Sequence, residues 1–133
     1  MTFGAMEAAQ AQGLVAGRDL LFSGINTSAE AMQAVVDGRL AALSGGHFLC
    51  GAWALVLLHD HHRGLDFMSE GLELQRPMFM LFDAPQARRF LQRFGDGQAL
   101  ALDFRPYSKA LNPGLKRYPF QLEGLLKAGS RSE

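Results

Sequence analysis

The chain has 133 residues, of which 48% are hydrophobic and 20% are charged, and it carries no formal net charge. This length and composition predict one ordinary globular domain, because disordered chains have few apolar residues and a large net charge. The chain has 13 basic and 13 acidic residues, so it lacks the excess of positive charge that would attract nucleic acid or an anionic membrane.

Cysteine content and hydropathy exclude further classes of protein. Cys50 is the single cysteine, which excludes an internal disulfide and a cysteine-based zinc cluster. Residues 1–4 lack the basic and apolar regions of a signal peptide. The longest apolar stretch, 48–58, has 11 residues, well short of the roughly 18 that a membrane span needs. The chain as given is expected to be soluble.

The first 25 residues predict a helix followed by a strand. The alanine-rich stretch 3–12 favours a helix that ends at Gly13. No capping sequence precedes this helix, which indicates that something upstream is absent. The continuous apolar run 20–25 is typical of a parallel strand buried on both faces.

A second helix and strand follow directly. Thr27 and Glu30 have the spacing of a capping box, with Thr27 as the N-cap. The helix should end at Gly38, and the run 40–44 predicts a short strand before the glycine pair 45–46. The predicted buried stripe of the helix consists of Ala29, Met32, Val35 and Val36.

The longest helical pattern covers 48–63 and is apolar almost all round, so we expect this helix to lie between two layers. Three histidines and Arg63 cluster in its last turn, where cations suit the negative end of the helix dipole.

The rest of the chain predicts a third strand at 78–82, a helix that begins with an Asp83–Gln86 capping box, and a short strand at 99–104. That helix should end at Gly95. Its predicted buried stripe consists of Ala87, Phe90, Leu91 and Phe94. The tail from 105 is expected to be ordered but irregular, and its Ser-Arg-Ser-Glu end disordered. Strands that alternate with helices predict an α/β fold with a mainly parallel sheet and helices on both faces.

This order of elements, with the residues at the strand ends, resembles a known family. The helix 3–9, the strand 21–26 with its Gly-x-Asn end, and the stretch 28–42 ending in Ala-Val-x-Asp-Gly-x-Leu-x-Ala carry the likeness. A strand and a Gly-rich turn follow. The pattern resembles the C-terminal part of type I periplasmic sugar-binding proteins, the solute receptors of ABC importers, and it covers about residues 1–95.

The resemblance implies a domain organisation. Residues 1–95 would form the C-terminal part of a periplasmic-binding-protein-like (Rossmann-like) fold, within a longer protein of two lobes. Helix 47–64 would pack on the missing N-terminal lobe, and 96–133 would be an irregular C-terminal extension. In isolation that helix would expose apolar surface, so we expect self-association of the chain.

The resemblance also points to ligand-binding residues. Sugar clefts need planar polar side chains beyond the carboxyl ends of parallel strands. Asn26 follows the strand 20–25, where the family often has Asp; the alternative is a turn or cap residue. Gly46 and His47 fall where similar proteins place a polar residue, often Gln, at a lobe crossover. His47 or the backbone would then replace that contact, and the alternative is a helix N-cap region with a hinge. Asn26 and His47 are expected to lie near each other.

Other candidate chemistries have less support. Trp53 is expected in the core rather than against a sugar. His59 and His62 share a helix face, but besides Asp60 and Asp66 no carboxylate or cysteine lies at a recognisable ligand spacing. We therefore interpret these residues as a solvated helix end and expect no metal. The basic and aromatic residues of 105–120 are expected to wrap the protein rather than bind nucleic acid. No nucleophile elbow or phosphate loop occurs, so neither an enzyme nor a cofactor is expected.

The resemblance therefore implies a fragment of a periplasmic sugar-binding protein that closes two lobes around a sugar or polyol and delivers it to an ABC transporter permease. The alternative is the effector-binding domain of a LacI-type transcriptional regulator, which has the same fold. A helix-turn-helix upstream would decide for the regulator, and a signal peptide for the receptor. A third interpretation is a small hydrolase that uses His47 and Asp66.

Overall fold

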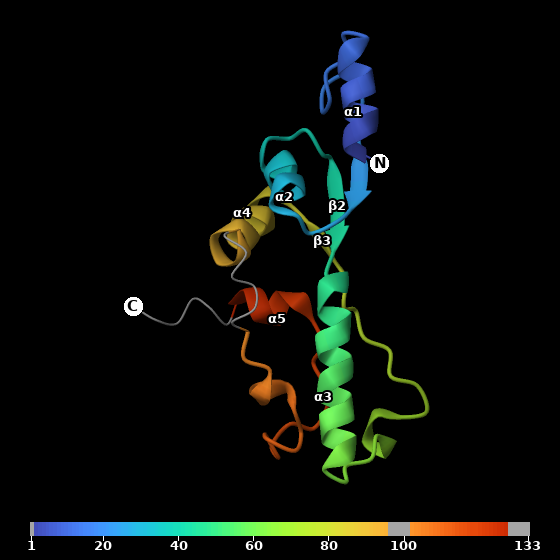
Figure 1. Cartoon of the computed structure of the whole chain (residues 1–133), viewed down its shortest axis with the longest axis vertical. Helices are drawn as coiled ribbons and strands as arrows, with labels where there is room; N and C mark the ends of the chain where they lie inside the picture. The colour runs from blue at the N-terminus through green and yellow to red at the C-terminus, as the bar shows by residue number, and fades with distance from the viewer. Residues whose placement is uncertain (1, 96–101, 128–133) are drawn as a thin grey trace. The chain divides into compact units, whose positions relative to one another are not determined.

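The computed structural model describes residues 2–95 and 102–127, which divide into two units (Figure 1). The first unit comprises 1–45 and 80–99, and the second comprises 46–79 and 100–133. The chain thus leaves the first unit after Gly45 and re-enters it at Met80. No helix among the described residues is long and apolar enough to cross a membrane.

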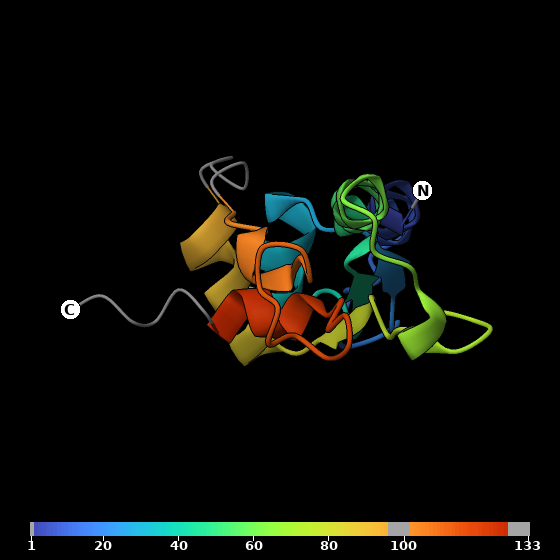
Figure 2. The same cartoon turned by 90° about the horizontal axis from the view of Figure 1, so that it is seen from below.

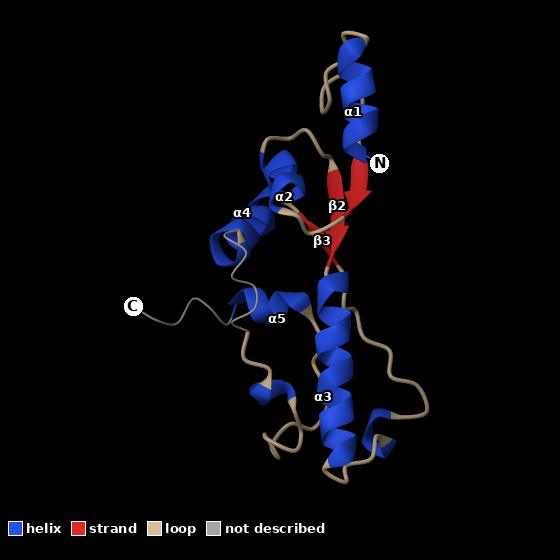
Figure 3. Cartoon of the chain, in the orientation of Figure 1, coloured by secondary structure: helices blue, strands red, loops and turns tan. Residues whose placement is uncertain are grey.

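The first unit contains a sheet of three short strands in the order β1-β2-β3 (Figure 3): β1 is Ser23–Ile25, β2 is Ala42–Gly45 and β3 is Met80–Phe82. β1 and β2 are parallel neighbours, as predicted. β3 is antiparallel to β2, with Gly45 opposite Met80, so the sheet is mixed and its parallel part is the β1–β2 pair. The predicted α/β class is confirmed. The third strand differs from the expected parallel arrangement, because β3 is antiparallel to β2.

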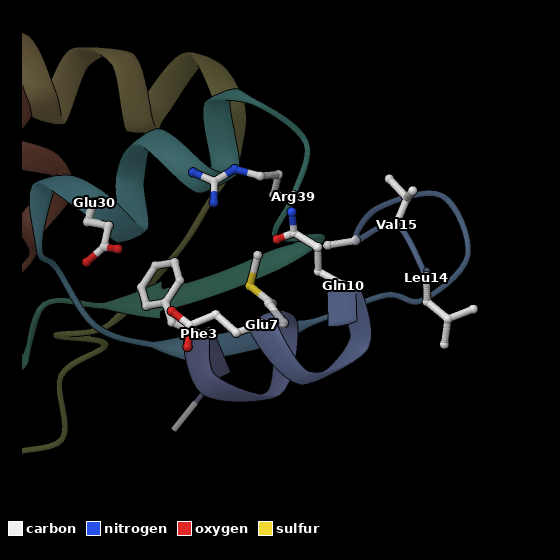
Figure 4. A pocket seen from close by; sticks show the side chains of 9 residues that line it. Phe3, Glu7, Gln10, Leu14, Val15, Glu30 and Arg39 are labelled. Carbon is white, nitrogen blue, oxygen red and sulfur yellow. The ribbon is translucent and has the colours of Figure 1, made fainter. Parts of the chain in front are cut away.

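Helices cover both faces of this sheet. α1 (Thr2–Ala11) lies on one side of the strands, and α2 (Ala29–Val36) and α4 (Ala84–Phe94) lie on the other (Figure 4). α2 and α4 pack side by side (Figures 1 and 2). The predicted capping box of α4 is confirmed: Asp83 accepts a hydrogen bond from the Gln86 N–H, and the Gln86 side chain accepts one from the Asp83 N–H.

The start of α2 is one residue later than predicted. Ser28, not Thr27, is the N-cap, and its Oγ accepts a hydrogen bond from the Ala31 N–H at 3.2 Å. The cause lies in Asn26, whose side chain binds the N–H groups of the next two residues and delays the helix. The buried stripe shifts accordingly and consists of Ala31, Met32, Ala34 and Val35, while Ala29 is exposed.

The prediction that strand 20–25 is buried on both faces is wrong. The strand is shorter, and Leu21 and Ile25 are 77% and 76% exposed. Among the described residues, β1 is an edge strand with a neighbour on one side only, and part of its apolar surface is uncovered.

The second unit is built around α3 (Cys50–His62), which follows a 3₁₀ turn η1 (His47–Leu49). Its other regular elements are the 3₁₀ turns η2 (Met68–Glu70) and η4 (Arg105–Tyr107) and the helix α5 (Leu122–Lys127). Trp53 is the centre of an aromatic cluster and stacks on Phe120 with ring centroids 4.8 Å apart. The prediction of Trp53 as a core residue is confirmed.

α3 is not enclosed on all sides among the described residues. It buries Trp53, Val56 and Asp60, whereas Leu55 and Leu58 are 67% and 64% exposed. The predicted sandwiching of this helix is therefore not observed here. The tail has irregular structure around short helical turns, as predicted, and its aromatic residues Tyr118 and Phe120 are buried. Half of the predicted strand 99–104 lies outside the described residues, and 102–104 have no strand structure; the end of the tail is likewise not described.

Candidate functional site

The parallel register of β1 and β2 brings their carboxyl ends to one edge of the sheet. The Asn26 N–H donates to the carbonyl of Ser44 at 3.0 Å, which extends the ladder one residue beyond β1. Because β3 is antiparallel, its first residue, Met80, lies at the same edge, opposite Gly45. This is the edge at which open α/β sheets bind ligands.

The Asn26 side chain has a defined local role at this edge. Its Oδ1 accepts hydrogen bonds from the Thr27 N–H at 2.7 Å and the Ser28 N–H at 3.2 Å. Its Nδ2 donates to Ser28 Oγ at 3.3 Å. These contacts are those of a turn residue that organises the start of α2, the alternative that the sequence left open. The side chain is exposed, and its contact with a ligand stays a prediction.

The glycine pair at the end of β2, Gly45 and Gly46, leaves no room for side chains. A Cβ at Gly45 would lie 2.7 Å from the Asn26 carbonyl oxygen. At Gly46 the backbone has φ +127°, and a Cβ would lie 2.3 Å from the Met78 carbonyl oxygen. Gly46 therefore allows 46 and 78 to approach closely, and any role in ligand binding belongs to its backbone.

This close approach yields a stability prediction. We expect Gly46→Ala to lower the free energy of unfolding by about 2 kcal/mol or more, because the methyl group meets a carbonyl in a backbone conformation that disfavours side chains. Urea unfolding followed by far-UV circular dichroism measures the change.

Gly51→Ala is the matched control, because a Cβ there meets nothing within 4 Å and the position lies inside α3. The free energy of unfolding of this control should rise by roughly 0.5–1 kcal/mol, since alanine is the better helix former. Equal stability of the two variants would contradict the argument.

His47 and Phe79 form an exposed aromatic pair in the second unit. Their ring centroids are 6.3 Å apart, with an angle of 23° between the ring planes. Phe79 is 49% exposed, and the His47 side chain is also exposed. The sequence did not single out Phe79, because 78–82 was predicted as one strand. The feature that could have indicated it is a large aromatic residue next to the point where the chain returns to the first unit, between 79 and 80. The predicted proximity of Asn26 to His47 remains a prediction.

A pocket of about 380 Å³ lies in the first unit between α1 and the segments around α2 (Figure 4). Phe3 and Met6 supply apolar surface, and Glu7, Glu30 and Arg39 add charged groups around it. Leu14–Ala16 and Arg39 precede β1 and β2, so this part of the pocket is near the amino ends of the strands. It is thus distinct from the carboxyl edge.

A second pocket, of about 230 Å³, lies in the second unit, where α3 meets the segment 74–78. Most of its lining is apolar, and Arg76 is its one charged residue.

The second unit also contains a fully buried carboxylate, Asp60, which sequence analysis treated as part of a solvated helix end. Tyr118 Oη donates to Asp60 Oδ2 at 2.7 Å, and the Lys109 N–H donates to the same oxygen at 2.7 Å. Ser108 Oγ donates to Oδ1. Burial alone would raise the pKa of Asp60, but these donors and His59 lower it to about 2. Asp60 thereby fastens 108–118 to α3.

A second carboxylate, Glu70, completes this anchoring. Its side chain is 1% exposed and accepts hydrogen bonds from Arg76 Nη2 and Lys109 Nζ. The Tyr118 N–H also donates to it, at 3.3 Å. Arg76 Nε in turn donates to the Tyr118 carbonyl at 2.7 Å. Asp60, Glu70 and their partners form a buried polar network, which we call the strap network, that holds 108–118.

Ser108, His59 and Asp60 lie together without forming a catalytic triad. Ser108 Oγ and Asp60 Oδ1 both meet the same ring nitrogen of His59, Nδ1, at 3.5 and 3.1 Å. In a triad the serine and the carboxylate engage different ring nitrogens. Here Ser108 gives its hydrogen to the carboxylate instead, so its hydroxyl is a structural donor.

The hydrolase interpretation with His47 and Asp66 is not supported by their positions. His47 precedes α3 and Asp66 follows it, and a helix of 13 residues is about 20 Å long. Asp66 caps the turn η2 through the Met68 N–H. Within 2–95 and 102–127, no three His, Cys, Asp or Glu side chains are grouped as metal ligands.

The helices and the mixed sheet of the first unit define an α/β class of fold, and comparison with solved structures shows which proteins the chain is similar to. The chain is similar to a periplasmic sugar-binding protein from Pseudomonas fluorescens, with 47% identity and a TM-score of 0.82 over 94% of this chain and 38% of that one. A structure from Mycobacterium smegmatis shares the fold, with 24% identity and a TM-score of 0.53 over 74% of this chain and 33% of that one. No protein-family profile and no curated protein matches. The predicted resemblance to periplasmic sugar-binding proteins is confirmed, and the chain spans 38% of the length of the first of these relatives.

Proposed function

We propose that this chain is part of a periplasmic receptor that binds a sugar or polyol and delivers it to the membrane permease of an ABC importer. The observation that carries the proposal is the 47% identity, over nearly the whole chain, to a protein described as a periplasmic sugar-binding protein. That relative is a binding protein, which favours a receptor over an enzyme and over a transcriptional regulator.

The arrangement of the chain supports this proposal. The carboxyl ends of β1 and β2 and the start of β3 share one edge, and the chain passes between the two units beside Gly45 and Met80. Two-lobed receptors close on their ligand by a hinge, and we propose that the whole protein to which this chain belongs works in this way. Asn26, the Gly46 backbone and His47 are the residues that we propose to contact the ligand.

We expect the 133-residue chain to bind free monosaccharides weakly or not at all, with a dissociation constant in the millimolar range or above. The chain spans 38% of its relative, so a ligand held between two lobes loses many of its partners. Losing two or three hydrogen bonds at ~1.5 kcal/mol each weakens binding by about two to three orders of magnitude. Isothermal titration calorimetry with D-ribose, D-galactose, D-glucose and L-arabinose measures the affinity.

The oligomeric state is measured on the same samples by analytical ultracentrifugation. We expect self-association, because Leu21, Ile25, Leu55 and Leu58 expose apolar surface. Micromolar binding by a stable monomer would contradict the view that half of the cleft is missing. Saturable millimolar binding of one or more of these sugars would support the proposed function.

A further inference from the structure

We propose that the pocket between α3 and the segment 74–78 is a binding site for a small aromatic carboxylate, held by the guanidinium of Arg76 and the indole N–H of Trp53. The pocket lies wholly in the second unit and has a volume of about 230 Å³. The proposal goes beyond sugar binding, because the ligand of this site is a flat apolar anion and not a polyol.

The indole N–H of Trp53 is a buried donor in need of an acceptor. Trp53 is 1% exposed and lines the pocket, yet its ring nitrogen has no hydrogen-bond partner among the described residues. Folded proteins pair nearly all of their buried donors, because an unpaired donor has lost its bonds to water and gained nothing in return. An acceptor atom in the adjoining pocket would remove this cost, which favours a ligand that carries an oxygen.

Arg76 supplies a positive charge to the same pocket, on a side chain that is 19% exposed and already fixed in place. Its Nε donates to the Tyr118 carbonyl and its Nη1 to the Gln75 carbonyl, each at 2.7 Å, and its Nη2 donates to Glu70. A guanidinium has five N–H groups, so two of them have no partner among the described residues. Because the group is held by its other bonds, an anion that binds it costs little further side-chain entropy.

The charges around Arg76 favour an anion. Glu70 carries one negative charge and is shared by two cations, Arg76 and Lys109. Asp60, the other carboxylate of the strap network, does not line the pocket and accepts its hydrogen bonds from Tyr118 and from its other donors. A carboxylate ligand would therefore meet more positive than negative charge at Arg76, and charge-assisted hydrogen bonds are stronger than neutral ones.

The rest of the lining fits a flat apolar body. Leu57, Leu74, Met78 and Phe120 contribute most of the apolar surface. An engineered cavity of roughly 150 Å³ in another protein binds benzene. About 230 Å³ therefore holds a benzene ring with a carboxylate attached. A sugar suits this lining poorly, because its hydroxyl groups need several polar partners.

The test adds sodium benzoate to the whole 133-residue chain and follows Trp53, the single tryptophan. Its fluorescence and its indole N–H signal in ¹H–¹⁵N NMR spectra should both change saturably, with a dissociation constant of about 1 mM. Benzyl alcohol has the same ring without the charge and should bind at least about tenfold more weakly. This comparison tests the role of Arg76 and leaves the strap network unchanged.

Ala54→Phe is the blocking variant, because residue 54 lines the pocket and its side chain has no polar group that the strap network could use. The added ring should weaken benzoate binding at least about tenfold by filling the pocket. Ala52→Phe is the matched control, since residue 52 is on the same helix but lines a different pocket. The control should keep wild-type affinity, and far-UV circular dichroism checks that both variants are folded.

Three results would each overturn the proposed site: no saturable change of the Trp53 signals with benzoate, equal affinity for benzyl alcohol, or benzoate binding that Ala54→Phe leaves unchanged. A response of the indole signal to D-galactose in place of benzoate would also overturn it, because the pocket would then belong to a sugar site. The sugar titrations under Proposed function use other ligands, so failure of either proposal leaves the other standing.

Discussion

Glu70→Gln is expected to lower the free energy of unfolding by about 3–5 kcal/mol, because the substitution leaves two largely buried cations without their anion. The carboxylate is 1% exposed and is shared by Arg76 and Lys109, whose side chains are 19% and 11% exposed. A glutamine has the same shape but no charge, and its NH₂ group would face donors. The loss is large relative to the 5–15 kcal/mol by which domains are usually stable.

Trp53, the single tryptophan, lies in the second unit, so its fluorescence in a urea titration reports on this change. Glu73→Gln is the control, since Glu73 is exposed a few residues along the same segment, and it should stay within about 0.5 kcal/mol of wild type. A double variant, Glu70→Gln with Lys109→Met, should recover part of the loss because one buried charge is removed. If Glu70→Gln is as stable as Glu73→Gln, the strap network does not hold 108–118.

Asp60→Asn is expected to cost about 3 kcal/mol at neutral pH, because Ser108, Tyr118 and the Lys109 N–H lose a charged acceptor. The cost should depend on pH in a defined direction. The pKa of Asp60 is lowered to about 2 in the folded protein, so the carboxylate contributes stability above its ordinary pKa near 4. That contribution, about 2.5 kcal/mol, is lost as the pH falls from roughly 5 towards 2.

Urea unfolding of wild type and Asp60→Asn at several pH values measures this dependence. The stability difference between the two proteins should shrink as the pH falls through 4 towards 2. Asp66→Asn is the matched control, since Asp66 is exposed and caps only the turn η2. A difference between wild type and Asp60→Asn that stays constant over this range would contradict the ionised, hydrogen-bonded state of Asp60.

Local sequence patterns determined much of the secondary structure and strand pairing of the first unit. The capping box of Asp83 and Gln86, the helix 3–12 and the parallel pairing of β1 with β2 were all predicted. These features depend on residues a few positions apart, or on a short helical connection that constrains its two strands. The order of elements also carried the resemblance that the comparison with a sugar-binding protein confirmed.

The predictions of burial failed where they depended on neighbours that a local pattern does not contain. The apolar run 20–25 indicates a strand but not how many strands flank it, and β1 lies at an edge. The exposure of Leu55 and Leu58 of α3 agrees with the expectation that this helix shows apolar surface in the isolated chain, and its packing on another lobe stays a prediction.

Only the tertiary structure decided the chemistry of the second unit. Asp60 was read with its histidine neighbours as a helix end, and its actual partners lie 48 and 58 positions away at Ser108 and Tyr118. The pairing of His47 with Phe79 follows from the antiparallel return of β3 and from the close approach at Gly46. The sequence by itself determined the types of side chain and the local elements that carry them. Which distant side chains meet is decided by how the elements pack, because a buried charge is stable only where the folded chain brings its donors.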